Sequence, residues 1–539
     1  MQKILRKNTG SITWYVPESE AHTLGGKLLE LNNPTWEEAV SIHKKGRRKV
    51  FASLGTTAGG EEIYLKAFRL TSLPLKLKCL FSSSKAVREL VTGLTALERG
   101  VPAVVPVAAG EKRRMGLVVE CYVLLKKIDS AVNLRDYLNR EDLPRCQRSR
   151  VIETLGRLAR KSHESGIFQT DFSLNNFLLK DPDDPVPVIC LIDFERTYVR
   201  DRLSDDMRNW TLAKLNRVRA DFTATDRLRF IKAYLADDDM DKQPLLQWMR
   251  ELDRSTCWIL RKDALRIHNA CVRGGRGYER YTNGSLSAYF LENNCGIEEL
   301  IRLMKNADKN LENVGATQTL GPFLSYKTCR KIRSGDMEVD VYKFLPAGSG
   351  SAGTGLAAGA WQAANALTKA NLPVSPVIGA VETGEGTSYR GYLFIRHIAA
   401  LKDLRTAVEE SLSCPGKKRA LLWHAARFLA KLHNHGVLSA NLSTGDIGIL
   451  EPPSGRINVY LMSPFKFKMA LTMTMDGTGT EDRESDLNRL EEFLGDLLQE
   501  NDVELLRKFY RLHSSNIPVT HGETPYSYTP GRWSIFRSP

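Results

Sequence analysis

Asp171, Asn176 and Asp193 are the residues of this chain whose types and spacing best suit a chemical step. Asp171 and Asn176 stand five residues apart in GIFQTDFSLNNFLL, and Asp193 follows in VICLIDFER. Phosphoryl transfer requires a carboxylate that orients the attacking hydroxyl and oxygen ligands that hold magnesium against the nucleotide phosphates. Asp171 suits the first task, and Asn176 and Asp193 suit the second. The trio predicts a kinase that uses ATP and Mg²⁺.

The elements around these residues favour the same interpretation. A helical run, LGRLARKSHESGI, ends near Gly166, and glycine is typical just after a helix. Two β-prone stretches, NFLLKD and VPVICLID, are separated by a segment of aspartates and prolines that favours a turn. We therefore expect a loop that carries Asp171 and Asn176, followed by a hairpin that ends at Asp193. The alternative is a structural role alone, in which these residues cap a turn and end a strand.

A kinase also needs a strand lysine that holds the α- and β-phosphates and a helical glutamate that fixes this lysine. Lys66 lies in the predicted strand GEEIYLKAFRL, and Glu89 lies in the helical stretch SSKAVRELVTGLTALERG that follows. We predict that Lys66 and Glu89 act together with Asp171. The alternative for Lys66 is an edge-strand lysine that faces water.

Two segments near Asp193 resemble a known family. LIDFER is similar to the strand-Asp-Phe-acidic segment of the lipopolysaccharide kinases (Kdo and heptose kinases), and DDMRNWTLAKLNR is similar to the Arg-Asn-Leu helix after it. The resemblance covers roughly residues 40–235 and implies an α+β, protein-kinase-like fold with a small β-rich lobe and a larger helical lobe. It also implies a heptose or Kdo hydroxyl of lipopolysaccharide core as the acceptor. Gln169 departs from the family, which usually has histidine there, and puts the rigidity of the loop in question.

The loop that covers the phosphates lacks its usual signature, because no Gly-rich motif precedes the Lys66 strand. We place this turn at residues 44–48, where Lys44 and Arg47 would supplement backbone N–H groups in binding phosphate. A solvated basic loop is the alternative. By analogy with the family, Lys126 begins the hinge against the adenine. Glu195 is a weaker candidate for a second metal ligand or a loop anchor.

The chain repeats itself at an offset of 270 residues. GIFQTDFSLNNFLL at 166–179 aligns with GVLSANLSTGDIGI at 436–449, and CYVLLKKI at 121–128 aligns with GYLFIRHI at 391–398. LERGVPAVVPV and LTKANLPVSPV keep the same offset. A constant offset across segments of different character predicts two tandem copies of one kinase-like domain.

The second copy lacks the residues that the chemistry needs. The predicted site positions change as follows: Asp171 becomes Asn441, Asn176 becomes Asp446, Asp193 becomes Ser463 and Glu89 becomes Gly359. Neither asparagine nor serine supplies the negative charge that Mg²⁺ prefers. Lys343 of VDVYKFL is the expected counterpart of Lys66, at an offset of 277. We predict a pseudokinase in which Asp446 could still bind a cation weakly; an active but divergent enzyme is the alternative.

Length and composition set the expected organisation. The chain has 539 residues, enough for two or three domains, and 42% of them are hydrophobic. We expect an active domain at 1–272, a Gly- and Arg-rich linker at 273–285 and a degenerate domain at 286–539. Nine cysteines show no metal-ligand spacing, and neither a signal peptide nor an apolar span of about 20 residues is evident. These features favour a reduced, cytoplasmic protein.

The net charge of +14 suits an anionic partner. Lipopolysaccharide core or another glycolipid fits as acceptor, and the charge favours peripheral contact with the anionic inner-membrane surface. Basic runs at 47–49 and 112–114 are the candidate patches. Aromatic and basic residues are not interleaved as in nucleic-acid-binding proteins, so no nucleic acid is expected. A basic excess that only maintains solubility is the alternative.

Two other functions stay open. The Asp-Phe-Glu triplet also resembles the choline and aminoglycoside phosphotransferases, whose cationic acceptors would favour an acidic pocket. Alternatively, both halves are a non-catalytic, nucleotide-binding scaffold in envelope assembly, which Gln169 and the missing Gly-rich loop favour. Retention of the charged set in the first copy, with its loss in the second, favours an active first domain.

Overall fold

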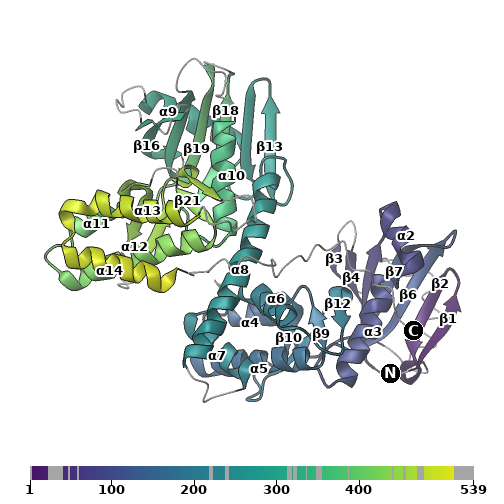
Figure 1. Cartoon of the computed structure of the whole chain (residues 1–539). Coiled ribbons are helices and arrows are strands. Elements are labelled where there is room, and N and C mark those ends of the chain that lie inside the picture. Colours follow the sequence, from purple (N-terminus) through teal and green to yellow (C-terminus); the bar gives the residue numbers. More distant parts are fainter. Residues whose placement is uncertain are drawn as a thin grey trace. The chain divides into compact units, whose positions relative to one another are not determined.

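A computed structural model of the chain describes two compact units, residues 1–256 and 257–539 (Figure 1). The described residues are 3–21, 41–45, 49–56, 60–217, 222–236, 242–311, 318–319, 324–334, 337–346, 355–385, 388–439, 442–452, 457–469 and 479–514. Each unit joins a β-rich lobe to a helical lobe. The α+β, protein-kinase-like fold with two bilobal domains is therefore confirmed.

A seven-stranded antiparallel sheet forms the small lobe of the first unit. Its strands in spatial order are β1 (Ile4–Thr9), β2 (Ile12–Pro17), β6 (Pro106–Arg114), β7 (Leu117–Lys126), β5 (Glu62–Arg69), β4 (Lys49–Thr56) and β3 (Ser41–Lys45). Helix α3 (Lys85–Glu98) begins at Ser84, whose hydroxyl accepts a hydrogen bond from the Val87 N–H. Helix α3 packs on this sheet beside a shorter helix, α2 (Leu73–Phe81).

The alternation of side chains along β5 decides which of them face α3. Leu65 and Ala67 pack with Trp14 on one side of the sheet. Phe68 packs on the other side with Leu90 of α3. Because successive side chains point to opposite faces of a strand, Lys66 shares the face of Phe68 and points toward α3.

The large lobe of the first unit is mainly helical. Its helices are α4 (Leu134–Leu138), α5 (Arg145–Glu164), α6 (Asp205–Asn216), α7 (Ala224–Leu235) and α8 (Lys242–Ala270). Two small sheets accompany them: β8 (Val132–Asn133), β10 (Phe177–Lys180) and β11 (Val188–Leu191) form one, and β9 (Ile167–Gln169) with β12 (Thr197–Val199) forms the other. Gly166 follows α5 with φ +70°, and a Cβ there would lie 1.8 Å from the Arg200 carbonyl oxygen, so the predicted glycine cap is required.

The second unit repeats this topology. Its large sheet has the strand order β13 (Tyr278–Asn283), β14 (Leu286–Leu291), β18 (Val377–Thr383), β19 (Arg390–Arg396), β17 (Met337–Pro346), β16 (Leu324–Ser334) and β15 (Gln318–Thr319). Its small sheets are β20 (Lys402–Asp403), β22 (Ile447–Leu450) and β23 (Asn458–Leu461), and β21 (Val437–Ser439) with β24 (Phe467–Met469). Its helices are α9 (Ile297–Leu311), α10 (Leu356–Lys369), α11 (Leu404–Glu409), α12 (Pro415–Asn434), α13 (Gly479–Leu494) and α14 (Glu500–His513). Strand for strand, the large sheets match.

The expected linker differs from the structure. Strand β13 lies inside the segment 273–285 and pairs with β14, so most of this segment is part of the second sheet. The division between the two compact units instead falls within α8. Glycines and arginines in this stretch suggested a linker, but the glycines serve the turns around β13.

Candidate active site

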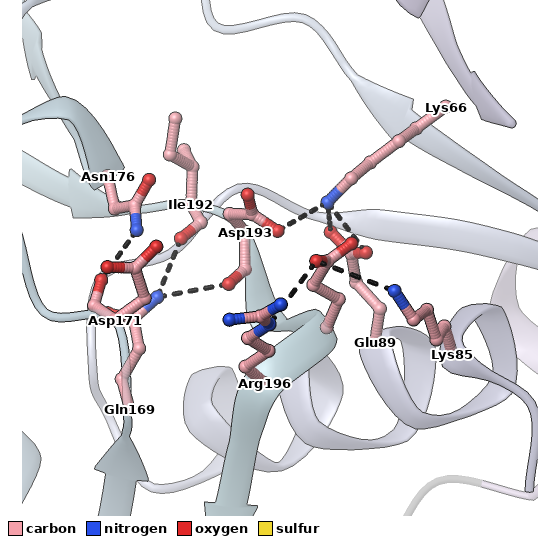
Figure 2. A network of polar contacts seen from close by, with 10 residues as sticks. Lys66, Lys85, Glu89, Gln169, Asp171, Asn176, Ile192, Asp193 and Arg196 are labelled. Carbon is pink, nitrogen blue, oxygen red and sulfur yellow. Dashed lines mark hydrogen bonds and ion pairs between the residues drawn. The ribbon is translucent and has the colours of Figure 1, made fainter. Parts of the chain in front are cut away.

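Lys66 lies between two carboxylates that reach it from distant parts of the first unit. Its Nζ is 2.7 and 2.8 Å from the two carboxylate oxygens of Glu89 on α3, and 2.6 Å from Oδ1 of Asp193 (Figure 2). The side chains of Lys66 and Glu89 are 5% and 1% exposed. Burial opposes the charge of this ammonium, but the two carboxylates outweigh burial and raise the pKa of Lys66. Lys66 is therefore a permanently charged cation in the site.

The backbone at Asp193 turns sharply after strand β11. Asp193 has φ 65°, which is uncommon for any residue other than glycine, and the short turn Phe194–Arg196 follows. Phe194 is buried and anchors this turn. The left-handed conformation is thus fixed by its neighbours, and it directs the carboxylate toward Lys66 (Figure 2).

Asp171 and Asn176 lie on one loop between β9 and β10. The Asn176 Nδ2 donates a 2.6 Å hydrogen bond to the Asp171 carbonyl oxygen. The Ile192 N–H donates to the Asn176 carbonyl oxygen at 3.0 Å, which ties the loop to the segment that carries Asp193. Asn176 is buried, whereas the Asp171 side chain is 52% exposed, 3.8 Å from the Arg217 guanidinium. The loop is fixed, and its carboxylate is accessible.

Gln169 supports the loop whose rigidity the sequence put in question. Its Nε2 donates to the carbonyl oxygens of Ile192 and Asp193, at 2.9 and 3.1 Å. The residue is 1% exposed. A glutamine amide carries two donors, so one buried side chain braces both peptides next to Asp193 (Figure 2). The absence of histidine therefore does not leave this loop unsupported.

Lys126 is a predicted residue that the structure does not bring to this cluster. The Lys126 ammonium lies at the end of β7, 3.0 Å from Glu20 and 2.9 Å from Glu61. Lys44 is placed on β3, but its side chain lies outside the described residues, as does the whole of Arg47. Their expected contact with phosphate stays a prediction. Lys85 lies 3.9 Å from the carboxylate of Glu195, and Arg196 lies 3.8 Å from it (Figure 2).

In the second unit, Tyr342 stands where the first unit has Lys66. Lys66 pairs with Val123 across the sheet, and Tyr342 pairs with Leu393, which is 270 residues after Val123. Tyr342 and Phe344 face α10, whereas Val341 faces α9. The expectation that Lys343 corresponds to Lys66 is therefore wrong by one residue.

That difference of one residue reverses the direction of the side chain. The ammonium of Lys343 is 2.5 Å from Asp308 of α9, on the far face of the sheet from α10. Tyr342 instead packs with the ring of Phe465 at a centroid distance of 5.0 Å, and Tyr326 and Phe344 contact the same ring. An aromatic cluster replaces the ion pairs of the first unit.

In the second unit, Asp446 is the carboxylate that remains at the positions of the predicted site, and Lys466 forms an ion pair with it. Lys466 Nζ lies 2.8 Å from Asp446 Oδ1, and the Ser443 backbone N–H and hydroxyl donate to Oδ2 of the same carboxylate. Lys466 and Asp446 are both buried, and Ser463 lies beside them in a pocket of about 330 Å³. Asn441 lies outside the described residues. Asp446, expected to bind a cation weakly, thus binds an ammonium of its own domain.

Tyr342, Phe465 and Lys466 were not recognised in the sequence. The alternation Val339, Val341 on β17 gives the correct face and could have identified Tyr342. No comparable signal exists for Lys466, because its partner is 20 residues away and the direction of its side chain depends on the packing of Phe465.

Comparison with known proteins agrees with this duplicated architecture. The model of the lipopolysaccharide kinase (Kdo/WaaP) family matches residues 39–234 and again residues 326–510. The chain belongs to this family. The two matches fall in the two units, as expected of a tandem duplication within the Kdo/WaaP family.

Individual relatives match parts of the chain. A 3-deoxy-D-manno-octulosonic acid kinase of Photobacterium profundum is 31% identical over 137 residues, 25% of this chain and 53% of the relative. A protein of the same name from Haemophilus influenzae is 31% identical over 126 residues, 23% of this chain and 48% of the relative. The chain thus spans about half the length of these Kdo/WaaP relatives. Among solved structures, WaaP in complex with acyl carrier protein is 19% identical, with a TM-score of 0.33, over 45% of this chain and 98% of that one.

Proposed function

We propose that the first unit transfers the γ-phosphoryl group of ATP to a heptose or Kdo hydroxyl of lipopolysaccharide core. The observation that carries this proposal is the pairing of buried Lys66 and Glu89 with the partly exposed Asp193, near the accessible carboxylate of Asp171 (Figure 2). Membership of the Kdo/WaaP family supports a sugar acceptor.

Each residue has a role that its surroundings support. The Asp171 carboxylate accepts the proton of the sugar hydroxyl while the hydroxyl oxygen bonds to the γ-phosphorus and the bond to ADP breaks. Lys66, held by Glu89, neutralises the α- and β-phosphates. Because its pKa is raised, Lys66 keeps its charge throughout the physiological range.

Magnesium fits the oxygen atoms that this site offers. Asp193 supplies a carboxylate and Asn176 a carboxamide, which are hard ligands of the kind that Mg²⁺ prefers, and Mg²⁺ usually takes only one or two carboxylates from a protein. When bound, the ion neutralises charge on the phosphates. Lys44, on β3, and Arg47, which follows β3 in the sequence, would cover the phosphates, and the hinge at Lys126 would contact adenine.

The second unit, in this proposal, is a pseudokinase. Its Lys466–Asp446 pair provides a cation that is part of the chain, and Tyr342 and Phe465 fill the space that the ion pairs occupy in the first unit. A divalent metal would have to displace an ammonium from a carboxylate that already accepts two further hydrogen bonds.

Lipopolysaccharide core is carried on a membrane lipid, so we place the protein at the cytoplasmic face of the inner membrane.

Transfer assays with labelled ATP test the proposal directly. The purified chain is incubated with Mg²⁺ and core oligosaccharide that contains heptose and Kdo, or with an aminoglycoside or choline. We expect transfer to the oligosaccharide, and a loss of about a thousandfold or more in Asp193→Ala because the carboxylate ligand of magnesium is removed. Asp183→Ala, in the exposed turn before β11, is the matched control and should keep full activity.

Two results would replace the proposal. Phosphorylation of the aminoglycoside or choline without transfer to the oligosaccharide would assign a small-molecule kinase. Equal ATP turnover in wild type and Asp193→Ala would assign the chain to the alternative function, a non-catalytic, nucleotide-binding scaffold. Mass spectrometry of lipopolysaccharide core from cells with and without the protein identifies the sugar that carries the phosphate.

A further inference from the structure

Helix α2 of the first unit presents its apolar side to solvent. Leu73, Leu77, Leu80 and Phe81 follow the i, i+4, i+7, i+8 spacing of one helix face, and they are 60, 44, 48 and 74% exposed. A surface helix normally turns such a stripe toward the core. Here Cys79 takes the inward position and packs with the core of the small lobe. Helix α2 therefore exposes the apolar face that a surface helix normally buries.

The exposed apolar surface has a second component at the turn between β6 and β7. Met115 at this turn is 93% exposed, with φ 50°. Helix α2 packs against β7, and Arg113 of the hairpin is close enough to Cys79 of α2 to interact with it electrostatically. We call α2 and this turn the apolar edge; its exposed members are Leu73, Leu75, Leu77, Leu80, Phe81 and Met115. In Figure 1, α2 lies at the outer end of the small lobe, next to β7.

The sequence around the apolar edge is basic throughout. Residues 70–88 contain the cations Lys76, Lys78, Lys85 and Arg88 and not one carboxylate. Residues 112–118, KRRMGLV, contain three more cations and again none of the opposite sign. Glu111 does neutralise Arg113, at 2.7 Å, and Lys85 lies 3.9 Å from Glu195, but the remaining cations of the two segments still give a positive excess. Apolar side chains surrounded by lysine and arginine are typical of protein surfaces that lie in the interface of an anionic bilayer.

We propose that the apolar edge docks the first unit on a bilayer surface that contains anionic phospholipid. Leucines and Phe81 would enter the acyl boundary, and the cations would meet the headgroups. Among the residues that the structure describes, no helix has both the length and the apolar character to span a bilayer, so the contact is with the surface. A second copy of the chain is a poorer occupant, because it would bring two basic edges face to face. The inference rests on this surface and not on the proposed reaction, so each can fail alone.

Vesicle co-sedimentation of the full chain tests the docking. Vesicles of phosphatidylcholine alone are compared with vesicles that also contain phosphatidylglycerol. We expect binding to the anionic vesicles that weakens at high salt. Leu77→Glu combined with Leu80→Glu should reduce the partition by about a hundredfold or more, because two leucines lose their burial in the acyl boundary. Leu412→Glu combined with Leu512→Glu is the matched control, since these leucines are also exposed but lie in the second unit, and it should bind like wild type.

The fold of the charged variant is checked by circular dichroism and ATP turnover, which should match wild type because both leucines are exposed. Leu77→Met combined with Leu80→Met, which keeps the apolar surface, should retain vesicle binding. Equal binding by wild type and the charged variant would overturn the proposal, as would equal binding to neutral and anionic vesicles. Self-association or capture of an acidic protein that depends on these leucines, without vesicle binding, would assign the surface to a protein partner instead.

Discussion

At the residue scale, Lys66 joins two carboxylates that lie 23 and 127 residues away from it in the chain. A buried charge that loses its partner is destabilising by about 3–5 kcal/mol. The contributions of Lys66, Glu89 and Asp193 to stability are therefore coupled, because removal of one residue leaves the others without an ion-pair partner. This coupling explains why the second unit has Tyr342, Gly359 and Ser463 at the same three positions and retains none of the charges.

Gln169 is the residue whose replacement best separates support of the loop from chemistry. Gln169→Ala would leave the partly buried carbonyls of Ile192 and Asp193 without the Gln169 donor, and we expect a loss of about 1–3 kcal/mol in the free energy of unfolding. ATP turnover should fall as well, because the peptide of Asp193 is no longer braced. Denaturant unfolding and turnover are measured together, with Gln169→His as the matched variant that restores a donor. An alanine variant equal to wild type in both measurements would contradict this role.

Sequence reasoning predicted the charged set of the first unit well, because each member belongs to a short motif on an element of clear type. The structure brings Lys66, Glu89 and Asp193 together, and Asp171 with Asn176. Sequence reasoning failed at Lys343, because the offset between the two strands is 276 residues and not the predicted 277. An error of one residue on a strand selects the wrong face. Lys466 depends on tertiary packing that no local pattern encodes.

At the element scale, α5 and α12 carry a histidine at equivalent positions. His163 contacts the Tyr234 hydroxyl of α7 at 2.9 Å, and His433 contacts the Tyr510 hydroxyl of α14 at 2.7 Å. Both histidines are 1% exposed. Burial, with a smaller effect of the nearby Arg208, lowers the pKa of His163 to about 3. This histidine holds two helices together as a neutral group.

Stability of the first unit should therefore fall in mild acid. Between pH 6.5 and about 3, the unfolded chain binds a proton at His163 and the folded chain does not, so the stability falls as the pH falls. Relative to a His163→Asn variant, we expect wild type to lose about 1.4 kcal/mol between pH 7.5 and pH 5.5. Chemical unfolding of both proteins at the two pH values measures this difference. A gap that stays constant between wild type and variant would show that His163 binds a proton as readily in the folded state as in the unfolded state.

The elements themselves were largely predictable, and their boundaries were not. The strand with Lys66, the helix with Glu89 and the cap at Gly166 all follow from periodicity and turn residues. The sequence of strand β13, YERYTN, resembles a linker because it lies between glycine-containing turns and alternates poorly, and five of its six residues are exposed. The segment is a strand because it pairs with β14, and this pairing depends on the sequence of β14 as well as on its own.

At the scale of the whole molecule, the two seven-stranded sheets share one strand order, whereas the ion-paired Lys66, Glu89 and Asp193 of the first unit are replaced by Tyr342, Gly359 and Ser463 in the second. We expect a single magnesium–nucleotide complex to bind per chain. Calorimetric titration with Mg²⁺ and a non-hydrolysable ATP analogue should give a stoichiometry of one, and Asp193→Ala should abolish this binding.

The matched variant for the titration is Ser463→Ala, at the equivalent position of the second unit, and it should leave the stoichiometry at one. Two equivalents bound by wild type, of which one disappears in each variant, would show that the second unit also takes a metal-bound nucleotide.

The aromatic cluster around Phe465 also bears on the evolutionary history of the second unit. If lysine returned at position 342, its ammonium would be buried among Tyr326, Phe344 and Phe465, opposite a glycine at position 359 that offers no counter-charge. Such a first step is disfavoured on its own. If the second unit is a pseudokinase, as proposed, a single mutation at position 342 would not rebuild the charged arrangement of the first unit, and its surface would be free to diverge for other purposes.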